Sequence, residues 1–190
     1  MSISLTALWL PILLSTLAAW IASMSIHMLL KYHDRDYQQL ANEDEVATAL
    51  RNGNPSKGIH TLPFCTDMKE LADPAMQKRF ADGPVAMVIV NDNGMPNMAK
   101  LIPQQVLFFL LGMTLVAYAA TLALQPGADY LVVFRFVATA AFLTYGWAQI
   151  PFAIWYGHPW GVTARFMLDA LIYALLSAGV FAWLWPALTA

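Results

Sequence analysis

The sequence is poor in cysteine and in charge. Cys65 is its only cysteine, which excludes an intrachain disulfide, a CxxC redox pair and a cysteine-rich zinc site. Only 12% of the residues are charged and 59% are hydrophobic, whereas a soluble domain has about 25% charged residues. Lipid must therefore surround much of the chain. The formal net charge of −2 provides no basic surface for nucleic acid.

Familiar catalytic and cofactor motifs are also absent. The sequence contains no nucleophile elbow, P-loop or HExxH. It has no internal repeat, which disfavours an inverted-repeat transporter. His27 is the only histidine inside a long apolar run, so a haem held by two buried histidines is not expected.

Scattered polar residues outside the apolar runs raise the question of a metal site. Their types suit zinc or copper: His33, Asp34, His60, Cys65 and Asp67. Their spacing matches no compact motif, and such scattered matches arise readily by chance. We therefore expect solvated surface residues here, and no metal and no cofactor.

Four apolar runs, each about 20 residues long, can each cross a hydrocarbon core of about 30 Å. The first, Leu5 to Leu30, is too long for a signal peptide and lacks a basic start, so we expect a retained helix. Pro103 and Thr163 are predicted to begin the second and fourth helices. The expected divisions are a first helix at 1–31, a polar α/β insert at 32–102 and a three-helix bundle at 103–190, with spans at about 103–125, 129–155 and 163–186. The predicted fold is thus an all-α membrane protein with four transmembrane helices and a small α/β insert between the first and second.

The insert has the local signals of a folded unit. Asn42 and the acids after it predict a helix that ends near Gly53. A short strand is expected at 59–64, and Asp73-Pro74 predicts a helix that ends at Gly83. A β-branched run at 84–90 predicts a second strand. The expected unit is β-helix-β with a preceding helix.

The positive charges predict the topology. Eight of the ten Lys and Arg residues lie between Lys31 and Lys100, and Arg165 flanks the third loop. The positive-inside rule places these segments in the cytoplasm and both termini in the periplasm. An insert longer than about 60 residues can translocate regardless of charge, so the opposite topology stays open.

Small residues recur every four positions in the last two runs. The fourth run carries Ala170, Ala174, Ala178 and Ala182. The third carries Ala140, Thr144 and Ala148 at the same spacing. Small residues let helix backbones approach closely in lipid, so we expect both stripes to be structural packing faces.

Polar residues gather at the insert side of the predicted bundle. His27, Gln149, Asp169 and Tyr173 come from three helices and form a candidate ligand or proton site. The alternative is structural, because Arg165 lies four residues before Asp169 and the two can pair on one helix face. A proton relay, a quinone or a lipid headgroup would all suit the functional reading.

The order of several short motifs resembles that of a group of small bacterial membrane proteins without a known activity. The matching segments cover most of the chain: Leu-Pro-Phe-Cys65, Asp73-Pro74-Ala-Met-Gln77, Phe80-Ala-Asp-Gly-Pro84, Pro96-Asn-Met98, Val133-Phe-Arg135-Phe, Tyr145-Gly and Gln149-Ile-Pro151. The resemblance implies a bacterial inner-membrane location and no mechanism.

The function expected from these features is non-catalytic: an accessory, assembly or interaction protein of the inner membrane. Its expected partners are the lipid bilayer and another membrane protein, and no nucleic acid. The alternative is a small membrane enzyme or a carrier of a ligand, quinone or proton. It would use the polar group in the cytoplasmic half of the bundle.

Overall fold

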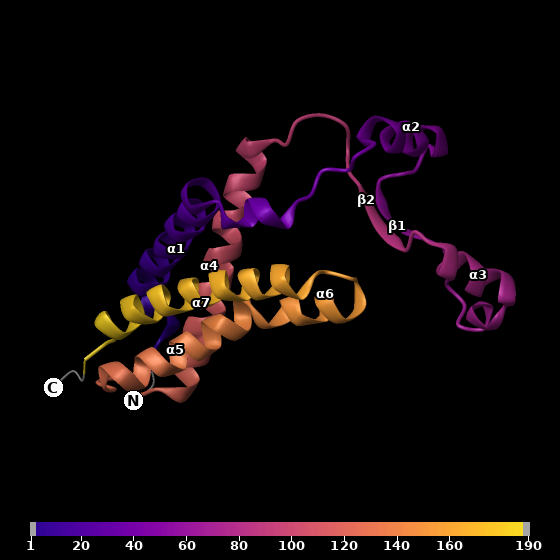
Figure 1. Ribbon diagram of the computed structural model, residues 1–190. Coiled ribbons are helices and arrows are strands. Elements are labelled where there is room, and N and C mark those ends of the chain that lie inside the picture. Colours follow the sequence, from indigo (N-terminus) through magenta and orange to yellow (C-terminus); the bar gives the residue numbers. More distant parts are fainter. Residues whose placement is uncertain (1–2, 188–190) are drawn as a thin grey trace. The chain divides into compact units, whose positions relative to one another are not determined.

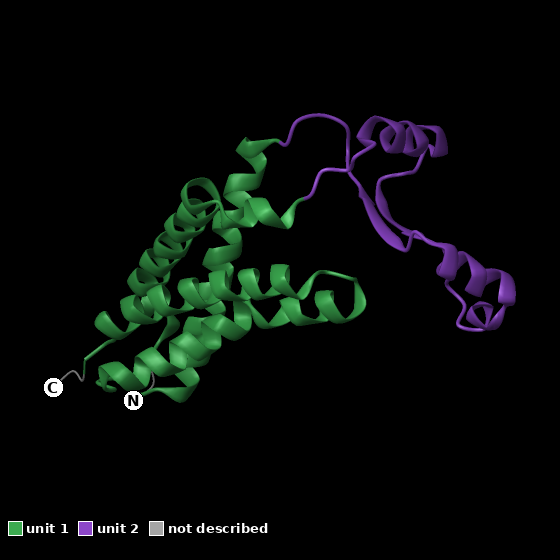
Figure 2. Ribbon diagram, in the orientation of Figure 1, with its two compact units in different colours: residues 1–37, 97–190 green, residues 38–96 purple. Residues whose placement is uncertain are grey.

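Figure 1 shows the computed structural model, which describes residues 3–187. The chain forms two compact units (Figure 2): unit 1 is Met1–Tyr37 with Asn97–Ala190, and unit 2 is Gln38–Pro96. Unit 2 is smaller than the predicted insert at 32–102. The residues just after the first helix and just before the second belong to the bundle.

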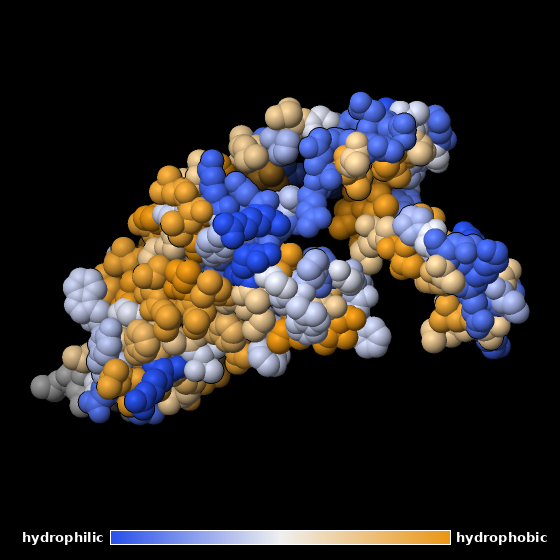
Figure 3. All heavy atoms as spheres, in the orientation of Figure 1, coloured by the Kyte–Doolittle hydropathy of each residue, from blue (hydrophilic) through white to orange (hydrophobic). Residues whose placement is uncertain are grey.

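Unit 1 is a helical membrane bundle. Within residues 3–187, four helical segments are long and apolar enough to span a bilayer: Leu5–Leu30, Met98–Ala123, Tyr130–Trp155 and Trp160–Trp183. Hydrophobic side chains form most of the visible surface of these helices (Figure 3), and many large ones are exposed, among them Leu111, Leu115 and Leu122. Lipid is the solvent that such a surface requires. The chain is a multi-pass all-α membrane protein with a small α/β insert, as predicted.

The first span changes helix type along its length. A 3₁₀ turn, η1 (Leu5–Leu8), leads into α1 (Trp9–Met24). The last turns form a π-helix, η2 (Ser25–Leu30). Lys31 then adopts the left-handed conformation at φ 50°, which ends the helix, and the 3₁₀ turn η3 (Tyr32–Asp36) follows.

Two predicted helix starts were wrong. The second span, α4 (Met98–Ala123), begins five residues before Pro103, because the Asn97 carbonyl already accepts hydrogen bonds from Lys100 and Leu101. The last span, α7 (Trp160–Trp183), begins three residues before Thr163. The Pro159 carbonyl accepts its first hydrogen bonds, so Thr163 lies inside the helix and is buried.

The third span is interrupted near its end. It consists of α5 (Tyr130–Tyr145), a 3₁₀ turn η5 (Trp147–Gln149) and α6 (Ile150–Trp155). Gly146 separates α5 from η5 and has no side chain. A Cβ there would lie 2.9 Å from that of Ala170, so glycine permits the close approach of α7.

Buried faces of α5 and α7 meet along the bundle, and the two helices run side by side in Figure 1. All four alanines of the α7 stripe are buried: Ala170, Ala174, Ala178 and Ala182. The predicted stripe on the third span was wrong, since Thr144 of α5 and Ala148 of η5 are exposed. The buried residues of α5 are instead Val133, Val137, Ala141 and Tyr145. This face lets the Tyr145 hydroxyl donate to the Phe109 carbonyl at 3.1 Å.

Unit 2 has the predicted order of elements. Its helices are α2 (Glu43–Gly53) and α3 (Pro74–Asp82), with a 3₁₀ turn η4 (Glu70–Ala72) before α3. Strands β1 (Gly58–Leu62) and β2 (Ala86–Val90) pair antiparallel, with Gly58 opposite Val90 and Leu62 opposite Ala86. Asp73 caps α3 by accepting from the Ala75 N–H at 3.0 Å. The β-helix-β unit with a preceding helix is confirmed.

Candidate functional site

Six polar side chains meet at the end of the bundle where the first span ends and the last begins. We call this set the polar cluster: His27, Tyr32, His33, Asp36, Arg165 and Asp169. The π-helix η2 supplies the first, the turn η3 supplies the next three, and α7 supplies the last two.

The local backbone explains how η3 reaches α7. The left-handed Lys31 donates its N–H to the Ile26 carbonyl at 3.0 Å and turns the chain sharply after η2. The following residues therefore fold back over the end of the bundle, where η3 contacts α7. Single-turn π-helices occur often at functional sites. On α7, Asp169 is nine residues after Trp160, which is about 14 Å along the axis.

Asp169 is the centre of the cluster, with only 2% of its surface exposed. Its Oδ1 accepts a hydrogen bond from the Tyr32 hydroxyl. Its Oδ2 lies 2.8 Å from Nε2 of His33 and 3.8 Å from Nε2 of His27. The side chain of His27 is 43% exposed, so one edge of the site is open to the surroundings.

His33 connects two carboxylates. Its Nδ1 lies 2.7 Å from Oδ2 of Asp36, while its Nε2 faces Asp169. The ring stacks on Phe166, with centroids 4.8 Å apart. A neutral imidazole has one N–H, so it can donate to only one of the two carboxylates. The cluster therefore holds an exchangeable proton or needs another cation.

Arg165 pairs with Asp36, and the predicted pairing with Asp169 was wrong. Its guanidinium donates to Oδ1 of Asp36, whose side chain is only 4% exposed. The oxygens of Asp169 are already occupied by Tyr32 and His33. The Arg165 hydrogen bond is the main reason that the pKa of Asp36 lies below its usual value. Burial opposes this effect, and His33 adds to it.

Tyr32 is fixed as a hydrogen-bond donor. Burial is the first cause that raises the pKa of its phenol, and the neighbouring Asp169 carboxylate raises it further. The hydroxyl therefore keeps its proton at neutral pH and donates it to Asp169.

The structure brings together part of the predicted site. His27 and Asp169 lie near each other, as the sequence suggested. Tyr173 is buried one turn beyond Asp169, and its ring packs edge-on against Phe109 at 5.3 Å. Gln149 lies in η5, and in residues 3–187 it makes no side-chain hydrogen bond to the cluster.

Three members of the polar cluster were missed from the sequence. Tyr32 and Asp36 were not considered, and His33 was assigned to the solvated surface although only 7% of its side chain is exposed. The available signal was the density of polar residues directly after the first apolar run. His60, Cys65 and Asp67, once considered with His33, belong to unit 2.

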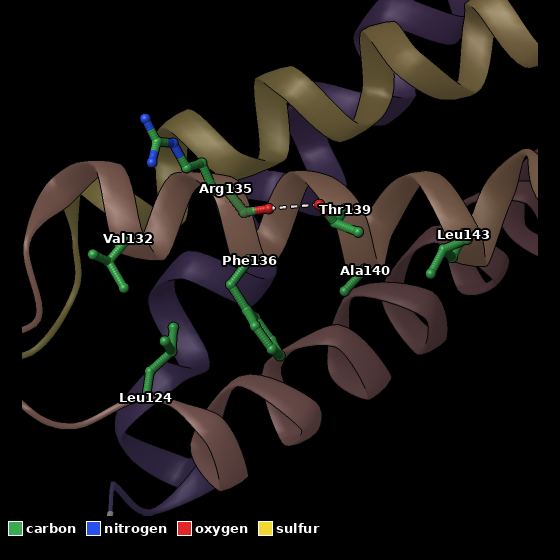
Figure 4. Close-up of a pocket in the computed structure, with 7 residues that line it drawn as sticks. All are labelled: Leu124, Val132, Arg135, Phe136, Thr139, Ala140 and Leu143. Carbon is green, nitrogen blue, oxygen red and sulfur yellow. Dashed lines mark hydrogen bonds between the residues drawn. The ribbon is translucent and has the colours of Figure 1, made fainter.

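Arg135 lies apart from the cluster, on α5. It borders an apolar groove of about 580 Å³ (Figure 4), whose lining is Leu124, Val132, Arg135, Phe136, Thr139, Ala140 and Leu143. Its guanidinium points away from Phe136 in this view, and its side chain is exposed. No salt bridge to Arg135 occurs within the described part of the chain. This exposure suits snorkelling of the Arg135 guanidinium to lipid headgroups.

The cluster could act chemically in two ways. His33 between two carboxylates can hold or pass a proton. Two imidazoles and a carboxylate can also bind a metal ion, since one ligand atom each from His27, His33 and Asp169 lies within 4.8 Å of the others.

No protein family, curated protein or solved structure matches this chain.

Proposed function

We propose that this protein is a bacterial inner-membrane protein that binds a small ligand at the polar cluster, as a membrane enzyme or a ligand carrier. One observation carries the proposal. A buried carboxylate, Asp169, is contacted by Tyr32 and His33 of η3 and is next to the half-exposed His27 of η2. Ionisable groups inside a membrane bundle are costly, and functional sites are where they are usually kept.

A purely structural link between α7 and η3 would not require the buried Asp169 carboxylate. Arg165 already neutralises Asp36, and this ion pair by itself links α7 to η3. Asp169 adds a second buried negative charge and no second permanent cation. Such an arrangement lowers stability unless a proton or a ligand compensates it.

An accessory role through the insert stays the second candidate, and the surface of unit 2 favours it. Ile59 and Ile89 face each other across the β1–β2 pair and both are largely exposed. Phe64 and Met68 are exposed on the same unit. Exposed apolar side chains in such numbers are typical of a protein or membrane contact.

The ligand content of purified protein distinguishes these two functions. The full chain is purified in mild detergent as wild type, as Asp169→Asn and as a matched control, His158→Gln, whose histidine lies in an exposed loop. Mass spectrometry and elemental analysis then report what accompanies each protein. A ligand present in the wild type and the control but absent from Asp169→Asn supports binding at the cluster. Identical ligand profiles in all three, at similar melting temperatures, would contradict it.

The proposed topology places the insert in the cytoplasm and both termini in the periplasm. The clustered positive residues support it. Cys65, in unit 2, is the only thiol and serves as a probe. In intact cells a membrane-permeant maleimide should label Cys65 and an impermeant one should not, although the latter labels it after lysis. Labelling of intact cells by the impermeant reagent would reverse the topology.

A further inference from the structure

We propose that His27, His33 and Asp169 bind one divalent transition-metal ion, with zinc or iron(II) as the chemical class. This rests on the proposed function, since it names the ligand of the polar cluster. The ion would lie between the two Nε2 atoms and a carboxylate oxygen of Asp169.

The distances bracket those that a metal ion imposes. Bonds of about 2.0–2.1 Å from one tetrahedral ion place its ligand atoms roughly 3.3 Å apart. Oδ2 of Asp169 lies 2.8 Å from Nε2 of His33 and 3.8 Å from Nε2 of His27. One of these distances is shorter and the other longer than an ion requires, and all three ligand atoms lie within 4.8 Å of one another.

Hydrogen bonds around the three residues orient them as metal ligands. Asp36 lies 2.7 Å from Nδ1 of His33 and can accept the proton of that nitrogen, and in that tautomer the Nε2 lone pair is available to an ion beside Asp169. Tyr32 donates to Oδ1 of Asp169, so Oδ2 remains the oxygen that both histidines approach. A carboxylate behind a ligating histidine is typical of metal sites.

The negative charge of Asp169 has no compensating cation in the cluster, because Arg165 pairs with Asp36. Asp36 is paired with Arg165, whereas the buried Asp169 has no Lys or Arg partner among the described residues. With neutral histidines, this carboxylate is an uncompensated charge at a depth where such charges are costly. A divalent ion bound to its oxygen would compensate it.

The ligand types restrict the class of ion. Imidazole and carboxylate ligands suit Zn²⁺ and Fe²⁺, whereas Cu(I) prefers sulfur ligands. Three protein ligands leave at least one coordination position free, as in catalytic rather than structural zinc sites. The half-exposed edge at His27 gives water or a substrate access to that position.

Metal titration of the full-length protein in detergent tests the proposal. Protein stripped with a chelator is titrated with Co²⁺, followed by its visible absorption, and Zn²⁺ is then added to displace it. One equivalent should bind. His27→Gln should weaken binding by at least about 100-fold, since loss of even a group behind a ligand costs 10–100-fold. Asp36→Asn should weaken it by about 10–100-fold, and His158→Gln should leave it unchanged.

The exposed position of His27 keeps the test interpretable, because its replacement should not unfold the bundle. Failure of the wild type to bind either ion would overturn the proposal. Equal affinity in the wild type and His27→Gln would also overturn it, because the ion would then lie elsewhere. An organic ligand that depends on Asp169, with no bound metal, would overturn the metal site while leaving the proposed function intact.

Discussion

Replacement of Arg165 should destabilise the protein through Asp36 and not through Asp169. In Arg165→Gln the Asp36 carboxylate, only 4% exposed, loses its cation. Breaking a buried ion pair on one side costs about 3–5 kcal/mol. Arg165 is 33% exposed and partly screened by water, so we expect about 2 kcal/mol. At 2–4 °C per kcal/mol for a chain of this size, the melting temperature should fall by roughly 6 °C.

A double-mutant cycle identifies the partner of Arg165. Melting temperatures in detergent are measured for Arg165→Gln, Asp36→Asn, Asp169→Asn and the two double variants that contain Arg165→Gln. Arg165→Gln should add little destabilisation once Asp36 is already asparagine, because the pair is gone; the coupling should be about 1–2 kcal/mol. Coupling with Asp169 should be less than half as large. A stronger coupling with Asp169 than with Asp36 would refute the Arg165–Asp36 pair between α7 and η3. It would favour instead the Arg165–Asp169 pair within α7.

Two further predictions concern packing and the insert. Ala174→Leu, at a buried position of α7, should lower the free energy of unfolding by about 1–3 kcal/mol through overpacking, and so lower the melting temperature in detergent. Ala164→Leu, at an exposed position of the same helix, should change the melting temperature little. Equal effects of the two substitutions would mean that the alanine stripe does not set the packing. Partial burial is the first cause that raises the pKa of Cys65, and the nearby Glu70 charge is the second. The alkylation rate of Cys65 should therefore reach half its maximum at a higher pH than the alkylation rate of a free cysteine. Glu70→Gln should move this pH profile back toward lower pH. A profile at or below that of a cysteine peptide would contradict this.

Much of the fold was predictable because lipid imposes a simple rule. A run of about 20 apolar residues must be helical to satisfy its backbone in the membrane. The elements of the insert followed from local capping, as at Asp73, which caps α3 as predicted. Helix starts were less predictable. Pro103 and Thr163 have the chemistry of helix starts, but backbone carbonyls further upstream accept the first hydrogen bonds.

The site was only half predictable. An acid and a histidine inside apolar runs are visible in the sequence, and Asp169 and His27 do lie together. The left-handed turn at Lys31 brings Tyr32, His33 and Asp36 to them. A lysine seldom adopts this conformation, so the sequence does not predict the turn. The four-residue spacing from Arg165 to Asp169 predicted a local pair, but tertiary contacts brought Asp36 into reach instead.

The coordination of zinc in the purified protein tests the polar cluster most directly. X-ray absorption at the zinc edge reports which atoms surround the ion. Binding at His27, His33 and Asp169 predicts a shell of nitrogen and oxygen at about 2.0–2.1 Å, with imidazole scattering from two histidines. In His27→Gln the imidazole scattering should fall by half or the zinc should be lost. A sulfur shell at about 2.3 Å would place the ion on Cys65, and an oxygen-only shell would place it on surface carboxylates. Either of these results would contradict the site.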